Sequence, residues 1–138
     1  MNRPEEALQR QVASFLWLVD PVALWTHVPN QRANRTQAAI LKAMGVKAGW
    51  ADLTFLMPTG AKVERGVIEL KAPRGKLSDA QLDFFVECRE TGVPWALCRS
   101  VVEVDATLRS WGVVYRNEPA GLSLELGEVS PWAGATRR

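Results

Sequence analysis

The feature that most constrains this chain is a pair of short apolar segments, residues 52–57 and 66–71, with Pro-Thr-Gly at residues 58–60 directly after the first. Each segment has the length and apolar content of a strand, and the Pro-Gly signal between them is typical of a turn. The pattern predicts a β-hairpin. In that hairpin, residues that lie opposite one another have numbers that add up to about 121.

This register places two acidic residues opposite each other, because the residue numbers of Asp52 and Glu69 add up to 121. Like charges directly across a strand pair destabilise it unless something positive lies between them. Lys71 is two residues beyond Glu69, so it lies on the same face of its strand. One or two carboxylates are the protein ligands that Mg²⁺ usually takes, and a metal-bound water beside a lysine can hydrolyse a phosphodiester.

An ion-pair ladder on the surface of an amphipathic hairpin is the structural alternative for Asp52, Glu69 and Lys71. The sequence around them argues against an exposed hairpin, because charges are rarely buried without a partner or a metal. The neighbouring residues that make both strands look buried are Leu53, Phe55, Val67, Ile68 and Leu70. This context favours a metal site.

The remaining elements follow from periodicity and capping signals. Residues 5–18 have the apolar spacing of an amphipathic helix, and Ser78-x-x-Gln81 is a capping box that opens a helix over residues 79–91, with Leu82, Phe85 and Val86 in helical register. Strands are predicted at residues 22–28 and 94–99, and helices at 34–44 and 100–110. The predicted order is α-β-α-β-β-α-β-α, an α/β fold with a mixed sheet flanked by helices.

The length of 138 residues and a hydrophobic content of 47% predict one globular domain with a short accessory segment. We expect the domain to span residues 1–112. For residues 113–138 we expect a C-terminal extension with a strand candidate at 113–116, followed by a mobile tail. Apolar runs are only a few residues long and the N-terminus has no apolar run behind its charges, so we expect a cytoplasmic protein without a membrane partner.

Charge is distributed unevenly along the chain. Residues 1–76 carry 11 Lys and Arg against 6 Asp and Glu, a net charge of +5, whereas residues 77–138 carry 6 against 9, a net charge of −3. Residues 21–51 contain no acidic residue. This favours a polyanionic partner, although a solvated basic face without a ligand remains the alternative on charge alone. The candidate phosphate-contacting residues are Asn30, Arg32, Arg35, Lys47, Arg74 and Lys76.

Several other chemistries lack their residues. Two cysteines, Cys88 and Cys98, and the single histidine, His27, make a structural zinc site very unfavourable. No nucleophile elbow accompanies His27, so a hydrogen-bonding or phosphate-contacting role is favoured over that of a general base. A phosphate-cradling G-x-x-x-x-G-K loop is absent from the sequence as well.

Four sequence pieces occur in a recognisable order: Glu5-x-x-Leu8-Gln9 in the first helix, Gly49-x-x-Asp52-Leu53, Glu69-Leu70-Lys71, and Lys76-Leu77-Ser78-x-x-Gln81. Together they resemble the VRR-NUC nucleases, a branch of the PD-(D/E)XK superfamily, over roughly residues 5 to 110. The resemblance implies a restriction-endonuclease-like core.

The resemblance also implies roles for individual residues. Asp52 and Glu69 are the implied metal ligands, with the backbone carbonyl of Leu70 as a third contact. Lys71 is the residue that positions the attacking water and stabilises charge on the scissile phosphate. Glu5 is the helix acid that points into the same site, rather than its neighbour, and Gln81 joins the catalytic set or serves as a helix cap, two roles that are compatible.

The function implied is a Mg²⁺-dependent endonuclease that hydrolyses DNA, with Mn²⁺ able to substitute. The resemblance further implies a homodimer that acts on branched or Holliday-junction-like DNA in repair or recombination, because two sites related by a two-fold axis can nick paired strands. A non-catalytic nucleic-acid-binding module with a vestigial site is the alternative.

Overall fold

The computed structural model describes residues 3–29 and 34–119 of the chain. Its elements are α1 (Arg3–Val19), β1 (Leu24–His27), α2 (Arg35–Ala43), β2 (Leu53–Leu56), β3 (Arg65–Leu70), α3 (Asp79–Thr91), β4 (Trp95–Cys98) and α4 (Val101–Ser110). The predicted α/β class and element order are confirmed, with boundaries that move by one or two residues.

The four strands form one mixed sheet in the order β1-β2-β3-β4. β2 pairs antiparallel with both β1 and β3, and β3 pairs parallel with β4. Within the hairpin Leu53 lies opposite Ile68 and Leu56 lies opposite Arg65. This is the predicted register, so the residue before Leu53 falls opposite the residue after Ile68.

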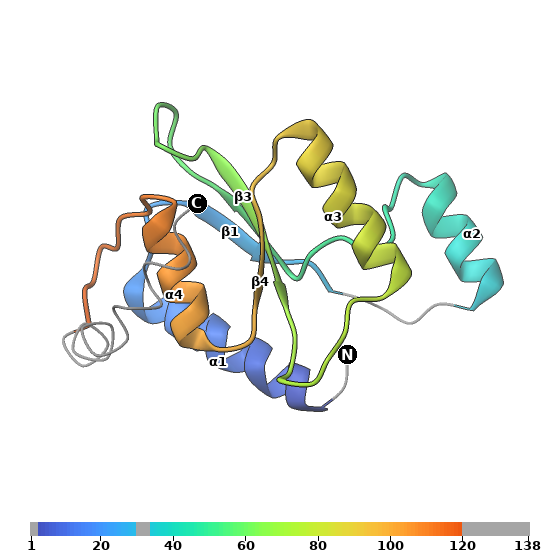
Figure 1. Cartoon of the computed structure of the whole chain (residues 1–138), viewed down its shortest axis with the longest axis horizontal. Helices are drawn as coiled ribbons and strands as arrows, with labels where there is room; N and C mark the ends of the chain where they lie inside the picture. The colour runs from blue at the N-terminus through green and yellow to red at the C-terminus, as the bar shows by residue number, and fades with distance from the viewer. Residues whose placement is uncertain (1–2, 30–33, 120–138) are drawn as a thin grey trace.

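Helices cover both faces of the sheet. α1 and α4 lie against one face and α3 lies against the other (Figure 1). The larger core is on the α1 side, where Val12 and Leu16 from α1 pack with Phe55, Ile68 and other buried residues. A smaller cluster under α3 contains Ala51, Val67, Phe84 and Cys88. The sheet therefore has a core on each side, which explains why its central strand β3 is apolar at consecutive positions.

The apolar residues that the helical pattern of residues 79–91 singled out are not the buried residues of α3. Leu82 and Val86 are 45% and 39% exposed, whereas Gln81, Phe84 and Cys88 are the buried residues of this helix. Apolar residues occur on both sides of α3, so periodicity alone could not orient it. Its first turn is fixed by a polar contact from Gln81, described below.

The helix at α2 was predicted, but its apolar residues do not enter the core. Asn34 and Gln37 form a capping box at its start, and none of its residues is buried. Ile40 is 54% exposed and Met44, at its C-terminal cap, is 75% exposed. Figure 1 shows α2 on the far side of α3 from the sheet.

Residues 113–116 do not form the predicted edge strand. Tyr115 makes one isolated antiparallel bridge with Pro21, and the Arg116 and Asn117 amides donate to the carbonyls of Asp20 and Val19 at the end of α1. The segment therefore pairs with the α1 terminus and not with the sheet. The mobile tail expected at the C-terminus falls in residues 120–138, outside the described part of the chain. Within the described part, no helix has the length and apolar character needed to span a membrane.

Candidate active site

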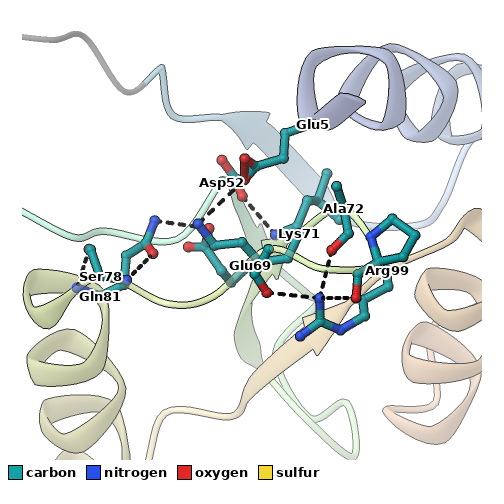
Figure 2. A network of polar contacts seen from close by, with 11 residues as sticks. Glu5, Asp52, Glu69, Lys71, Ala72, Ser78, Gln81 and Arg99 are labelled. Atoms are coloured by element: carbon teal, nitrogen blue, oxygen red, sulfur yellow. Dashed lines mark hydrogen bonds and ion pairs between the residues drawn. The ribbon is translucent and has the colours of Figure 1, made fainter. Parts of the chain in front are cut away.

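Two carboxylates are buried side by side at the end of the central hairpin. Asp52 directly precedes β2 and is 1% exposed, and Glu69 near the end of β3 is 2% exposed. The paired register ends at Leu53 and Ile68, the immediate neighbours of the two acids, and the side chains of Asp52 and Glu69 interact with each other, as the sequence predicted. Asp52 is held in place because its Oδ2 accepts a hydrogen bond from the amide of Leu70 at 2.7 Å. Figure 2 shows this contact in the centre of the polar network.

Gly49 explains how the chain reaches Asp52. Its φ of +79° is in the left-handed region, and a Cβ at this position would lie 2.2 Å from the Ala80 carbonyl oxygen and 2.8 Å from the Gln81 amide. Residues with a side chain cannot fit there. The segment before β2 therefore passes directly against the first turn of α3, and this close approach brings Asp52 and Gln81 to the same end of the sheet.

Lys71 and Glu5 complete the buried set from two different elements. Lys71 follows β3 and Glu5 lies in the first turn of α1, and the Lys71 Nζ is 3.3 Å from the Glu5 Oε1. Both residues are buried, at 8% and 9% exposure, whereas Glu6 is exposed. Glu5 thus faces inward, because it shares the buried face of α1 with Leu8 and Val12.

Gln81 has two structural roles at once. It forms a capping box with Ser78. The Gln81 Oε1 accepts from the Ser78 amide at 2.9 Å, and the Gln81 amide donates to the Ser78 hydroxyl at 3.2 Å. Its Nε2 donates to the Glu69 Oε2 at 3.2 Å. The capping role is therefore present in the geometry, and the hydrogen bond to Glu69 ties the start of α3 to the carboxylate pair (Figure 2).

Electrostatics at the pair disfavour two negative charges. Burial raises the pKa of Glu69 well above its usual value, and the adjacent Asp52 raises it further, whereas Lys71 opposes the shift and Glu5 adds to it. Among the described residues, no basic side chain is in ion-pair contact with Asp52 or Glu69, since Lys71 pairs with Glu5. The pair thus lacks the positive charge that two ionised carboxylates require.

The residues present fit a hard divalent cation. Among the described residues, no three His, Cys, Asp or Glu side chains are grouped so that they could hold one metal ion together. A cage of many protein ligands is therefore not built here. Two carboxylates together with a nearby main-chain carbonyl instead match the ligand set of Mg²⁺, which keeps several waters and substrate oxygens.

His27 contacts the backbone beside the pair. Its Nδ1 donates to the Asp52 carbonyl oxygen at 2.9 Å, and the Val28 amide donates to the same oxygen at 2.8 Å. The carbonyl can only accept, so Nδ1 carries the hydrogen. The imidazole therefore fixes the strand end that carries Asp52, which agrees with the hydrogen-bonding role that the sequence favoured.

The candidate phosphate contacts have different surroundings. Arg35, Arg74 and Lys76 are exposed. Lys47 forms an ion pair with Glu87, with 2.7 Å between Nζ and Oε2, so an acidic residue already contacts its ammonium group. Asn30 and Arg32 lie outside the described residues.

One residue at the network was not identified from the sequence. Arg99, directly after β4, donates from its guanidinium to carbonyl oxygens of the segment that follows Lys71. Its partners are more than 20 residues away along the chain, and no local pattern around Arg99 marks it.

Comparisons with known proteins agree with this architecture. The family model of the VRR-NUC domain matches residues 3–102. A solved structure titled "VRR_NUC domain protein" is similar with a TM-score of 0.62 and 22% identity, covering 80% of this chain and 89% of that one. A second, titled "VRR_NUC domain", has a TM-score of 0.53 and 17% identity, covering 78% and 97%. No curated protein matches the chain.

Proposed function

Because the chain belongs to the VRR-NUC family, a nuclease family, we propose that it is a metal-dependent endonuclease that hydrolyses phosphodiester bonds in DNA. The observation that carries this proposal is the burial of two carboxylates, Asp52 and Glu69, next to each other and without a basic side chain in ion-pair contact within the described part of the chain. Such an arrangement is costly for a purely structural site. It is favourable where a divalent cation is bound during function.

In this proposal Asp52, Glu69 and the backbone carbonyl of Leu70 hold Mg²⁺ or Mn²⁺. The bound ion would supply an activated water and neutralise charge on the phosphate. The Leu70 amide and the Gln81 side chain keep the two carboxylates oriented, because each donates a hydrogen bond to one of them. Oriented oxygen ligands of this kind lose little freedom when a metal binds.

Lys71 is the proposed catalytic cation. It is buried beside Glu69 and its Nζ is held by Glu5, so its position is fixed before substrate arrives. An ammonium group with three donors can position the attacking water and stabilise negative charge that develops on the phosphate. Glu5 orients Lys71 and contributes to the same site.

The substrate surface is proposed from charge. Arg35, Arg74 and Lys76 are exposed cations, and Asn30 and Arg32 belong to the acid-free part of the sequence. Contacts from such residues to the phosphate backbone supply affinity without sequence preference. Lys47 joins them in this proposal, although it would have to contact the phosphate backbone while it is also paired with Glu87.

We further propose a cytoplasmic homodimer that selects branched DNA.

The test is cleavage of a panel of linear, nicked, flapped and four-way DNA with Mg²⁺, Mn²⁺ or chelator. We expect metal-dependent products from the wild type and none from Glu69→Gln. Glu90→Gln, which removes an exposed acid of α3, is the matched control and should cleave normally. DNA binding without metal-dependent cleavage of any substrate would instead identify a non-catalytic binding module.

A further inference from the structure

Arg99 holds the segment that follows the proposed catalytic lysine. Its Nη1 lies 2.6 Å from the carbonyl oxygen of Ala72, 3.2 Å from that of Pro73 and 3.0 Å from that of Gly75. The backbone of Arg99 is anchored in turn, because its amide donates to Glu103 Oε1 at 2.8 Å at the start of α4. Figure 2 shows the guanidinium pointing into the turn formed by residues 72–75.

The contact determines which side of this turn faces outward. The Gly75 amide donates to the Ala72 carbonyl at 2.9 Å, which closes the turn. Three carbonyl oxygens of the turn point inward, toward one positive nitrogen. Oxygens that point inward cannot present their negative partial charge to an approaching phosphate, so the outer side of the turn remains favourable for an anion.

The turn carries two exposed cations at the edge of the site. Arg74 lies within it and Lys76 follows it, between Lys71 and the helix cap that holds Gln81. The turn also lies close over the lysine, because a Cβ added at Gly75 would be 3.3 Å from the Lys71 Cδ. Arg74 and Lys76 are therefore attached to a segment whose position relative to Lys71 is fixed by Arg99.

We propose that Arg99 is a positioning residue that organises residues 72–76 into a phosphate-binding loop, an inference that rests on the proposed nuclease function. In this proposal Arg99 acts from behind the loop and not on the substrate, because its Nη1 is engaged by the three carbonyls and the residue is half-buried. It acts through the loop, which presents Arg74 and Lys76 to the DNA strand beside the metal site.

The first experiment measures binding of a DNA duplex in Ca²⁺, and then KM and kcat in Mg²⁺, for three variants. Arg99→Met keeps the aliphatic stem and removes the donors. We expect it to weaken DNA binding and raise KM roughly tenfold, with a smaller change in kcat. Arg99→Lys should recover most of the affinity, because an ammonium group also offers three donors. Arg89→Met removes the same charge from an exposed site in the last turn of α3 and should leave KM unchanged.

A double-mutant cycle separates action through the loop from a direct effect. In an Arg74→Gln, Lys76→Gln background the loop has lost its cations, so adding Arg99→Met should change affinity by less than about twofold. An equal, tenfold loss in both backgrounds would contradict the proposal, since Arg99 would then act independently of Arg74 and Lys76.

Limited digestion with trypsin tests the loop without any nuclease activity. Cleavage after Arg74 and Lys76, followed by mass spectrometry, should be several-fold faster in Arg99→Met than in the wild type, Arg99→Lys or Arg89→Met. Unchanged digestion, or faster digestion with unchanged DNA affinity and KM, would overturn the inference alone. Absence of DNA binding by the wild type would overturn the proposed function and the inference with it.

Discussion

Two regions of this molecule bury acidic side chains, and they treat the charge differently. At the hairpin end, Asp52 and Glu69 lie next to each other without a basic partner in contact among the described residues. At α4, Asp105 is fully buried, but its Oδ1 accepts from the Tyr115 hydroxyl at 2.6 Å and both of its oxygens lie 3.1 Å from the Arg109 Nε.

The pKa directions do not distinguish these regions, but the partners do. Burial raises the pKa of both Glu69 and Asp105. For Glu69 a second carboxylate adds to the increase, whereas for Asp105 the hydroxyl of Tyr115 and the guanidinium of Arg109 oppose it. A buried acid whose hydrogen-bonding and charge requirements are met within the protein can be tolerated as part of the fold. A buried acid that lacks a counter-charge indicates a ligand.

The largest expected effect is on cleavage. Glu69→Gln preserves the acceptor for Gln81 and removes the negative charge, so metal binding and cleavage should be lost together. Removing several kcal/mol of transition-state stabilisation corresponds to a rate decrease of about 10³-fold or more. Asp105→Asn should cleave at close to the wild-type rate at a temperature where it is folded. Single-turnover experiments measure the cleavage rate of each variant. An equal loss of rate in Glu69→Gln and Asp105→Asn would remove the distinction between the two regions.

The next effect is stabilisation by metal. A ligand that binds only the native state raises the free energy of unfolding by about 2.7 kcal/mol at a hundredfold excess over its Kd. We expect Mg²⁺ to raise the Tm of the wild type and of Asp105→Asn, but not that of Glu69→Gln. Titration calorimetry provides the Kd independently. A Tm increase in Glu69→Gln equal to that of the wild type would place the metal elsewhere.

In the absence of metal, the two regions should respond with opposite signs. Asp105→Asn places an amide donor against the Arg109 donor, which should lower the free energy of unfolding by about 2 kcal/mol. Asp52→Asn still accepts from the Leu70 amide and relieves repulsion with Glu69, so its stability should stay the same or increase. Urea unfolding with chelator measures both, with Asp83→Asn as an exposed control. Destabilisation by Asp52→Asn as large as that by Asp105→Asn would make the hairpin pair structural.

Much of the first region was predictable from sequence, because it depends on short-range rules. The register follows from strand periodicity and one turn, and the inward direction of Glu5 follows from its face on α1. The orientation of α3 did not follow, because apolar residues lie on two of its faces and Gln81 decides which one faces the sheet. Arg99 and Asp105 were missed because their partners come from segments that only the tertiary fold brings near them.

The smallest expected effect is a pH dependence at Asp105. Its pKa in the folded protein is raised by burial, so the native state holds this proton to higher pH than the unfolded chain, and the associated stability falls as pH rises through the native pKa. Tyr115, Arg109 and Glu118 are the titratable groups that influence it. The stability advantage of the wild type over Asp105→Asn should therefore be largest at acidic pH and decrease toward neutral pH. Other groups titrate in both proteins, so their contributions cancel in this difference.

Urea unfolding of both proteins with chelator, from below the ordinary Asp pKa of about 3.9 up to neutral pH, measures the difference in the free energy of unfolding. An advantage that increases with pH would show that Tyr115 and Arg109 outweigh burial, and the α4 region would then be a favourable ion-pair site and not a tolerated buried acid.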